Sequence, residues 1–160
     1  MKTICKVNSR RLGEYYSLKN EGSKPFKNPM KSCQLLEVNK DDVIVDIGAY
    51  IGEYSMMVAE KVKKVISYEA TLDTFNVLKM NKRGSMTIHN LAVVGDDRKS
   101  VDLYISKGIG VNNSIEKKAG KSSKTTIKAI RYEEAVKEAT VVKIDVEGAE
   151  YGYNIIQPNL

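Results

Sequence analysis

The residues best suited to bind a ligand form a DxGxxxG pattern at Asp46, Gly48 and Gly52. The pattern comes at the end of an apolar, β-branched run, residues 43–47, which is typical of a strand buried on both faces. Beyond Gly52 the apolar residues are spaced by three and four, as on one face of a helix. The pattern therefore marks a strand-to-helix turn, in which Gly48 permits a tight bend and Gly52 lets the helix start close to the sheet.

Two acidic residues indicate which ligand this turn accepts. A dinucleotide site places a pyrophosphate on the helix N-terminus and favours GxGxxG, whereas Asp46 repels phosphate and attracts an ammonium group. Glu69 follows the next apolar run, residues 65–68, and a carboxylate at that place accepts hydrogen bonds from ribose hydroxyls. A nucleoside with cationic groups and no phosphate suits both residues. We therefore predict S-adenosylmethionine as the cofactor.

The elements around these motifs predict an α/β domain. A helix capped by Thr71 follows the second strand, and Gly84 lies beyond the end of that helix. Strands joined by a helical crossover run parallel, and the connection between them is right-handed. A third strand is predicted at residues 87–93, an antiparallel excursion over 100–130, a short helix at 132–139 and a fourth parallel strand at 141–145. We expect the strand order 3-2-1-4.

Composition restricts the class of protein. The 160 residues suit one domain, and 42% hydrophobic with 29% charged residues is ordinary for a folded chain. No apolar run approaches the roughly 18 residues of a membrane span, and the N-terminus lacks a signal-peptide core, so we expect no membrane association and a cytoplasmic location. Cys5 and Cys33 have neither zinc nor disulfide-framework spacing. The net charge of +6 comes from scattered lysines and is a weak signal for nucleic acid.

Four segments together resemble the FkbM-type methyltransferases, over roughly residues 35 to 151. They are VDIGAYIGEYS at 45–55, YE at 68–69, NLAVVGD at 90–96 and VKIDVEGAE at 142–150. The resemblance implies a Rossmann-like class I methyltransferase fold, with residues 1–40 as an N-terminal lead-in and 41–160 as the cofactor-binding domain. The family domain continues through further strands after KIDVEGAE, so we expect the C-terminal strands to be missing here.

The resemblance also implies where the cofactor binds. Asp46 and the glycine turn would hold the methionine portion, Glu69 the ribose, and the chain near Leu91 and Ala92 the adenine. Two departures from the family pattern lie in this region, because Tyr50 stands where Asn is common and Ala70 where Pro is common. The complete set of predicted cofactor-binding residues is Asp46, Gly48, Ala49, Tyr50, Gly52, Glu69, Ala70, Leu91 and Ala92.

Asp145 and Glu147 are the predicted catalytic residues, because they follow the fourth strand beside the crevice of the sheet. Alignment of the acceptor oxygen with the sulfonium methyl supplies much of the catalysis, and a carboxylate can help to remove the hydroxyl proton. The alternative is that Asp145 caps the next helix and that Glu147 and Glu150 hold the loop. We predict no metal, because no histidine accompanies these carboxylates.

The resemblance implies a function as well, and we accordingly predict O-methylation of a hydroxyl group on a small molecule or sugar. Two alternatives remain at this stage: an RNA methyltransferase, and a truncated domain that binds cofactor without catalysis. In the order 3-2-1-4, the strand at 141–144 lies at the edge of the sheet with unpaired backbone groups. We therefore expect either a fragment of a longer protein or a homodimer formed through this edge.

Overall fold

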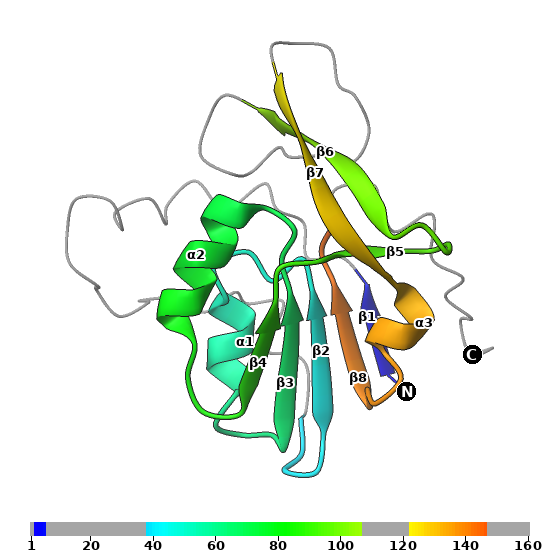
Figure 1. Ribbon diagram of the computed structural model, residues 1–160. Coiled ribbons are helices and arrows are strands. Elements are labelled where there is room, and N and C mark those ends of the chain that lie inside the picture. The colour runs from blue at the N-terminus through cyan, green and yellow to red at the C-terminus, as the bar shows by residue number, and fades with distance from the viewer. Residues whose placement is uncertain (1, 6–37, 107–121, 147–160) are drawn as a thin grey trace.

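The computed structural model describes residues 2–5, 38–106 and 122–146. Five strands of these ranges form one parallel sheet in the order β1-β8-β2-β3-β4 (Figure 1). They are β1 (Lys2–Cys5), β2 (Val43–Ile47), β3 (Lys64–Tyr68), β4 (Met86–His89) and β8 (Val141–Ile144). Four of them, β4-β3-β2-β8, have the predicted order 3-2-1-4. The Rossmann-like α/β fold is therefore confirmed.

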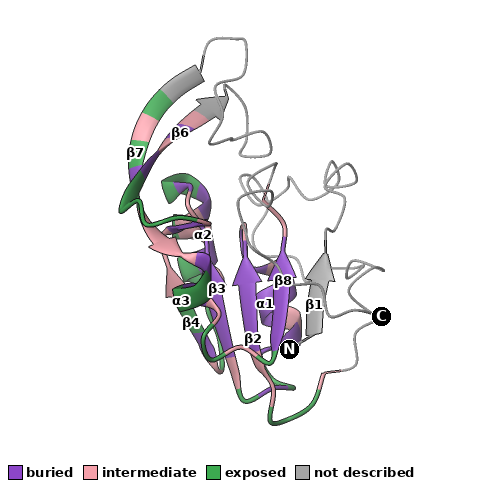
Figure 2. Cartoon of the chain, turned by 90° about the vertical axis from the view of Figure 1, so that its right-hand side faces the viewer, coloured by how far each residue is buried: buried purple, intermediate pink, exposed green. Residues whose placement is uncertain are grey.

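Alternating side chains of the strands build a core on each face of the sheet. On one face Ile44 and Val141 pack with the helices α1 (Glu53–Val58) and α2 (Leu72–Asn81). On the other face Val45 and Val142 pack with α3 (Tyr132–Ala135), which is shorter than the predicted 132–139. Figure 2 shows β2, β3 and β8 buried over most of their length, as expected for central strands of a parallel sheet.

None of the helices in the described ranges combines the length and the apolar character needed to cross a bilayer.

A second sheet contains the predicted antiparallel excursion. Its strands are β5 (Ala92–Val94), β6 (Ser100–Ser106) and β7 (Ser122–Arg131), in the order β5-β7-β6. β6 and β7 are antiparallel, whereas β5 is parallel to β7. In Figure 1 the β6–β7 ribbon extends beyond the carboxyl ends of the main strands. The excursion is confirmed in its β6–β7 pair, and β5 adds a parallel strand to it.

The predicted third strand at residues 87–93 is wrong as one continuous element. The chain leaves the main sheet after His89 and enters the second sheet at Ala92. Asn90 holds the bend, because its Nδ2 donates hydrogen bonds to the carbonyl oxygens of Glu69 and Ala70 at 2.8 and 2.9 Å. The apparently continuous β pattern is thus divided at residues 90–91 into two strands in two sheets.

The prediction that the strand 141–144 lies at the sheet edge is also wrong. β1 pairs with β8 in parallel, from Lys2 opposite Val141 to Cys5 opposite Ile144. The pairing partner comes from the segment interpreted as a lead-in, and it satisfies the backbone groups on the outer side of β8. The unpaired edge that suggested a homodimer therefore does not exist at β8.

Candidate functional site

The glycine turn, residues 48–52, has an unusual backbone conformation that brings it against the end of β3. Gly48, Tyr50 and Gly52 have φ values of 75°, 55° and 91°. The amides of Gly48 and Ala49 both donate to the carbonyl oxygen of Tyr68 at 3.0 Å. The conformation explains the two glycines, since positive φ strains most other residues. Tyr50 accepts that strain and is the one non-glycine of the described chain that does so.

The turn also touches the end of β8. A Cβ atom on Gly48 would lie 2.1 Å from the carbonyl oxygen of Asp145, so only glycine fits this approach. The Asp145 amide donates to the Ile47 carbonyl oxygen at 2.9 Å, which fixes the two strand ends to each other. The turn therefore lies between the carboxyl ends of β3 and β8, where ligands bind in open α/β sheets.

Glu69 connects the glycine turn to the start of α2. Its Oε2 accepts a hydrogen bond from the Tyr50 amide at 2.9 Å. Its Oε1 accepts from the Thr71 amide at 2.8 Å and from the Thr74 hydroxyl at 2.9 Å. The residue is 8% exposed, and burial raises the pKa of its carboxyl although these hydrogen bonds act in the opposite direction. A ribose hydroxyl would have to share oxygens that already accept from the protein.

The same hydrogen bonds alter the predicted cap of α2. Thr71 is the N-cap residue, as predicted, but its side chain makes no capping hydrogen bond. The Thr71 amide instead bonds to the Glu69 carboxylate two residues earlier. Glu69 thus orders the beginning of the helix, and a change at Glu69 affects both the turn and α2.

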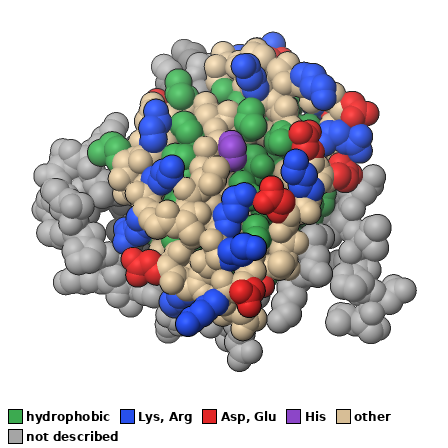
Figure 3. Space-filling model, turned by 60° about the horizontal axis from the view of Figure 1, so that its bottom comes forward, with side chains coloured by type: hydrophobic (Ala, Val, Ile, Leu, Met, Phe, Trp, Pro, Cys, Tyr) green, Lys and Arg blue, Asp and Glu red, His purple; other side chains and the backbone are tan. Residues whose placement is uncertain are grey.

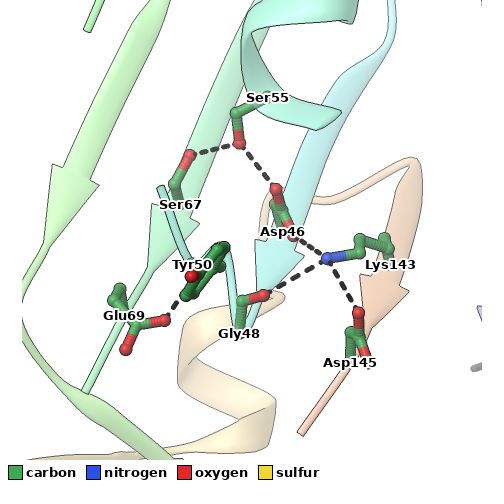
Figure 4. A network of polar contacts seen from close by, with 8 residues as sticks. All are labelled: Asp46, Gly48, Tyr50, Ser55, Ser67, Glu69, Lys143 and Asp145. Atoms are coloured by element: carbon green, nitrogen blue, oxygen red, sulfur yellow. Dashed lines mark hydrogen bonds and ion pairs between the residues drawn. The ribbon is translucent and has the colours of Figure 1, made fainter. Parts of the chain in front are cut away.

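Asp46 is fully buried and is bonded within the protein. Its Oδ2 accepts from the Ser55 hydroxyl at 2.7 Å, and its Oδ1 accepts from Lys143 Nζ at 2.9 Å (Figure 4). The Ser55 hydroxyl lies 2.8 Å from that of Ser67. The cation beside Asp46 is therefore a lysine of this chain, in the place where the sequence predicted the ammonium group of a cofactor.

Of the two predicted catalytic residues, the structure describes Asp145, whereas Glu147 lies outside the described residues. Asp145 follows β8, and its side chain is 21% exposed. Its Oδ2 lies 3.9 Å from Lys143 Nζ, close enough for an ion pair and too far for a hydrogen bond. Asp145 is thus placed at the glycine turn with part of its carboxylate accessible.

The residues predicted near the adenine lie at the junction of the two sheets. Ala92 is buried in the core of the second sheet, and Ala70 packs against the same cluster. Leu91 packs on the main sheet with the side chains of the α3 face. Because Asn90 bonds to the backbone at Glu69 and Ala70, this junction is fixed next to Glu69.

Two charged residues of the site, Lys143 and Glu53, were not predicted from the sequence. Lys143 is 5% exposed and lies among Asp46, Gly48 and Asp145. Glu53 begins α1, and its Oε1 is buried without a hydrogen-bond partner in the described part of the chain. Burial raises the pKa of Glu53, and the charge of Lys143 lowers it. A signal for Lys143 was present, since a lysine inside a four-residue buried strand needs an acidic partner.

Comparisons with known proteins gave matches among solved structures. No protein-family model matches the sequence, and neither does any curated protein. A methyltransferase FkbM from Methylobacillus flagellatus KT aligns over 74% of this chain and 29% of its own, with 17% identity and a TM-score of 0.48.

Two further structures align over shorter parts. A protein from Listeria monocytogenes, assigned as an S-adenosylmethionine-dependent methyltransferase, matches 42% of this chain and 32% of its own, with 16% identity and a TM-score of 0.36. A dimethyladenosine transferase from Plasmodium falciparum matches 32% and 21%, with 16% identity and a TM-score of 0.30. This chain spans less than a third of the length of each of the three.

Proposed function

We propose that this chain binds S-adenosylmethionine at the carboxyl end of its parallel sheet, as the cofactor-binding part of an O-methyltransferase. The observation that carries the proposal is the 2.9 Å hydrogen bond from the Tyr50 amide to Glu69 Oε2. It joins the two motifs that the sequence assigned to the methionine and ribose portions, although they are 19 residues apart. A nucleoside seated across this bond would contact the glycine turn on one side and Glu69 on the other.

The charges of the site suit a cationic ligand. Four carboxylates, those of Asp46, Glu53, Glu69 and Asp145, lie at or next to the turn, and Lys143 is the cation that the structure describes among them. Such an excess of negative charge repels a pyrophosphate and attracts ammonium and sulfonium groups. The buried Oε1 of Glu53 is an acceptor that still lacks a donor within the described residues, and a ligand ammonium group would supply one.

The residues then divide the work as follows. The glycine turn and Glu53 hold the amino-acid portion of the cofactor, and Glu69 orients the ribose. When bound, S-adenosylmethionine supplies an electrophilic methyl group to an acceptor oxygen. Asp145, partly exposed at the end of β8, accepts the proton that the hydroxyl loses. The alternative role of Asp145 is to hold the strand end through its ion pair with Lys143.

We favour a small molecule or sugar as the acceptor over RNA. On the face shown in Figure 3, Lys and Arg side chains stand among Asp and Glu side chains instead of forming a patch of one sign. Several of these charges are paired, for example Lys64 with Glu138 at 3.0 Å. Nucleic-acid binding needs a concentrated positive surface. This face, which looks onto the amino ends of the strands, does not offer one, and at the carboxyl ends the four carboxylates of the proposed site outnumber the described cation, Lys143.

Calorimetry with S-adenosylmethionine, S-adenosylhomocysteine and NAD tests the cofactor assignment. The first two should bind and NAD should bind more weakly. Glu69→Ala should weaken binding by about 1–3 kcal/mol, because it removes charged hydrogen bonds to the ribose and the bonds that order the glycine turn and the start of α2. Glu138→Ala is the matched control, since it removes an exposed glutamate bonded to Lys64 at the opposite ends of the strands. Equal affinity of both variants would contradict the role of Glu69.

Labelled cofactor tests the reaction itself. Transfer of the methyl group to sugars or small alcohols, and not to RNA, is the expected result. Transfer to RNA alone would reverse the preferred acceptor class. Tight cofactor binding with no transfer to any class would indicate a domain that binds without catalysis.

A further inference from the structure

Three polar residues form a row across the main sheet, beneath the glycine turn. Ser67 of β3 is in register with Asp46 of β2, and Asp46 is in register with Lys143 of β8. Each is the next-to-last residue of its strand, and their exposed fractions are 0%, 0% and 5%. Ser55 of α1 closes the row from above through its bonds to Asp46 and Ser67. A buried row of this kind is stable only when its members satisfy one another.

Lys143 reaches further than the rest of the row. Its Nζ donates to Asp46 Oδ1 at 2.9 Å and to the carbonyl oxygen of Gly48 at 3.2 Å. The same atom lies 3.9 Å from Asp145 Oδ2 (Figure 4). It also lies 5.9 Å from the centre of the Tyr54 ring. One ammonium group therefore contacts the strand before the turn, the turn itself and the residue after β8.

We propose that Lys143 is a positioning residue for the cofactor: it fixes the glycine turn and the Asp145 carboxylate relative to each other. This inference rests on the function proposed above. Lys143 provides, from the neighbouring strand, a donor that faces the Gly48 carbonyl oxygen, whereas the bonds of the turn to Tyr68 and Glu69 are made by its amides. Without Lys143, the Gly48 carbonyl and the Asp145 carboxylate lose the partner that they share, while the contact of Gly48 with the Asp145 backbone and the Asp145 amide bond to Ile47 remain.

A purely structural role predicts something different. On that view Lys143 only neutralises the buried charge of Asp46, and removal of both charges restores the stability and the cofactor affinity. Asp46→Asn/Lys143→Met removes both charges at similar volume, while the amide that replaces the Asp46 carboxylate can still bond to Ser55. The positioning role predicts that this double variant regains most of the stability lost in Lys143→Met but not its cofactor affinity, because no donor faces Gly48.

The experiment compares urea unfolding and S-adenosylhomocysteine affinity in the wild type, Lys143→Met and the double variant. Both variants should bind about tenfold more weakly or worse, the loss expected from charged hydrogen bonds. Val142→Ala is the control, because Val142 is fully buried in the same strand and faces the other side of the sheet. It should lose stability while it retains the wild-type affinity.

Amide NMR signals of Gly48, Ala49 and Tyr50 add a measurement that needs no cofactor. They should shift in the double variant and stay in place in Val142→Ala. A double variant with wild-type affinity and unshifted turn signals would overturn the positioning role alone. A wild-type chain that binds neither S-adenosylmethionine nor S-adenosylhomocysteine would overturn the proposed function, and the role of Lys143 in it.

Discussion

Replacing Gly48 with alanine would force a methyl group against the backbone of Asp145. The new Cβ would lie 2.1 Å from the Asp145 carbonyl oxygen and 2.9 Å from the carbonyl carbon. Neither atom can rotate away as a side chain would, so the turn and the end of β8 must separate. Gly48 also has a φ of 75°, which strains alanine even without the contact.

The free-energy loss follows from the bonds that this separation breaks. The left-handed backbone costs alanine about 1–2 kcal/mol. The Asp145 amide would lose its 2.9 Å bond to Ile47, worth about 1 kcal/mol net, and Lys143 would lose its 3.2 Å bond to the Gly48 carbonyl, worth about 1.5–3 kcal/mol. Alanine also reduces the freedom of the unfolded chain, which offsets about 0.4–1 kcal/mol of this loss. We therefore expect Gly48→Ala to lower the free energy of unfolding by about 3–5 kcal/mol.

Gly84→Ala is the matched control for backbone strain alone. Gly84 has a φ of 51°, but a Cβ there would lie no closer than 3.6 Å to its nearest neighbour, an ordinary contact. Its loss should be about 1 kcal/mol, since alanine also reduces the freedom of the unfolded chain.

Urea denaturation measures both variants. With a slope of about 2 kcal/mol per molar urea, the two midpoints should differ by about 1–2 M. Equal losses in the two variants would refute the close approach of the turn to Asp145.

Three further predictions concern stability. A Cβ on Gly52 would lie 2.5 Å from Leu78 Cδ1. In a urea double-mutant cycle, the stability losses of Gly52→Ala and Leu78→Ala should therefore be less than additive by at least about 0.5 kcal/mol. Additive losses would show that the two sites do not touch. Burial and the charge of Lys64 lower the pKa of His89 below 6.5, so the folded state binds the imidazole proton more weakly than the unfolded state. The free energy of unfolding should therefore fall as the pH drops below 6.5. His89→Gln should reduce this fall in unfolding measurements, and an unchanged pH dependence would contradict the role of His89. Tyr50 has a φ of 55°, which asparagine tolerates better than a β-branched residue. Tyr50→Val should therefore be less stable to thermal unfolding than Tyr50→Asn, by about 1 kcal/mol. The reverse order would exclude strain at this residue.

Local patterns were sufficient for much of the fold. The run at 43–47, the helical spacing after Gly52 and the position of Glu69 predict β2, the turn, α1 and β3 correctly, because burial and backbone strain act on neighbouring residues. In the same way, the glycines at 48 and 52 indicate positions of positive φ. The placement of Glu69 beside the turn also followed from the sequence, since adjacent parallel strands end at the same edge.

Contacts across the sheet were beyond the local pattern. Residues 2–5 carry no sign that they pair with β8, and the division between β4 and β5 depends on where the Asn90 amide finds its acceptors. The partner of Asp46 was misjudged for the same reason, because the carboxylate and the Lys143 ammonium are 97 residues apart.

The sequence by itself therefore determined which residues stand at the carboxyl ends of the strands, and the tertiary structure decided which charges they face there. A side chain at Asp46 is acidic in any fold, but whether it is open to a ligand depends on its register with β8. That register places the Lys143 ammonium 2.9 Å from the Asp46 carboxylate. Because Asp46 is fully buried, the lysine takes the place of a cation from outside the protein. Pairing across a sheet is set by the packing of the whole core, which no short segment of the chain encodes.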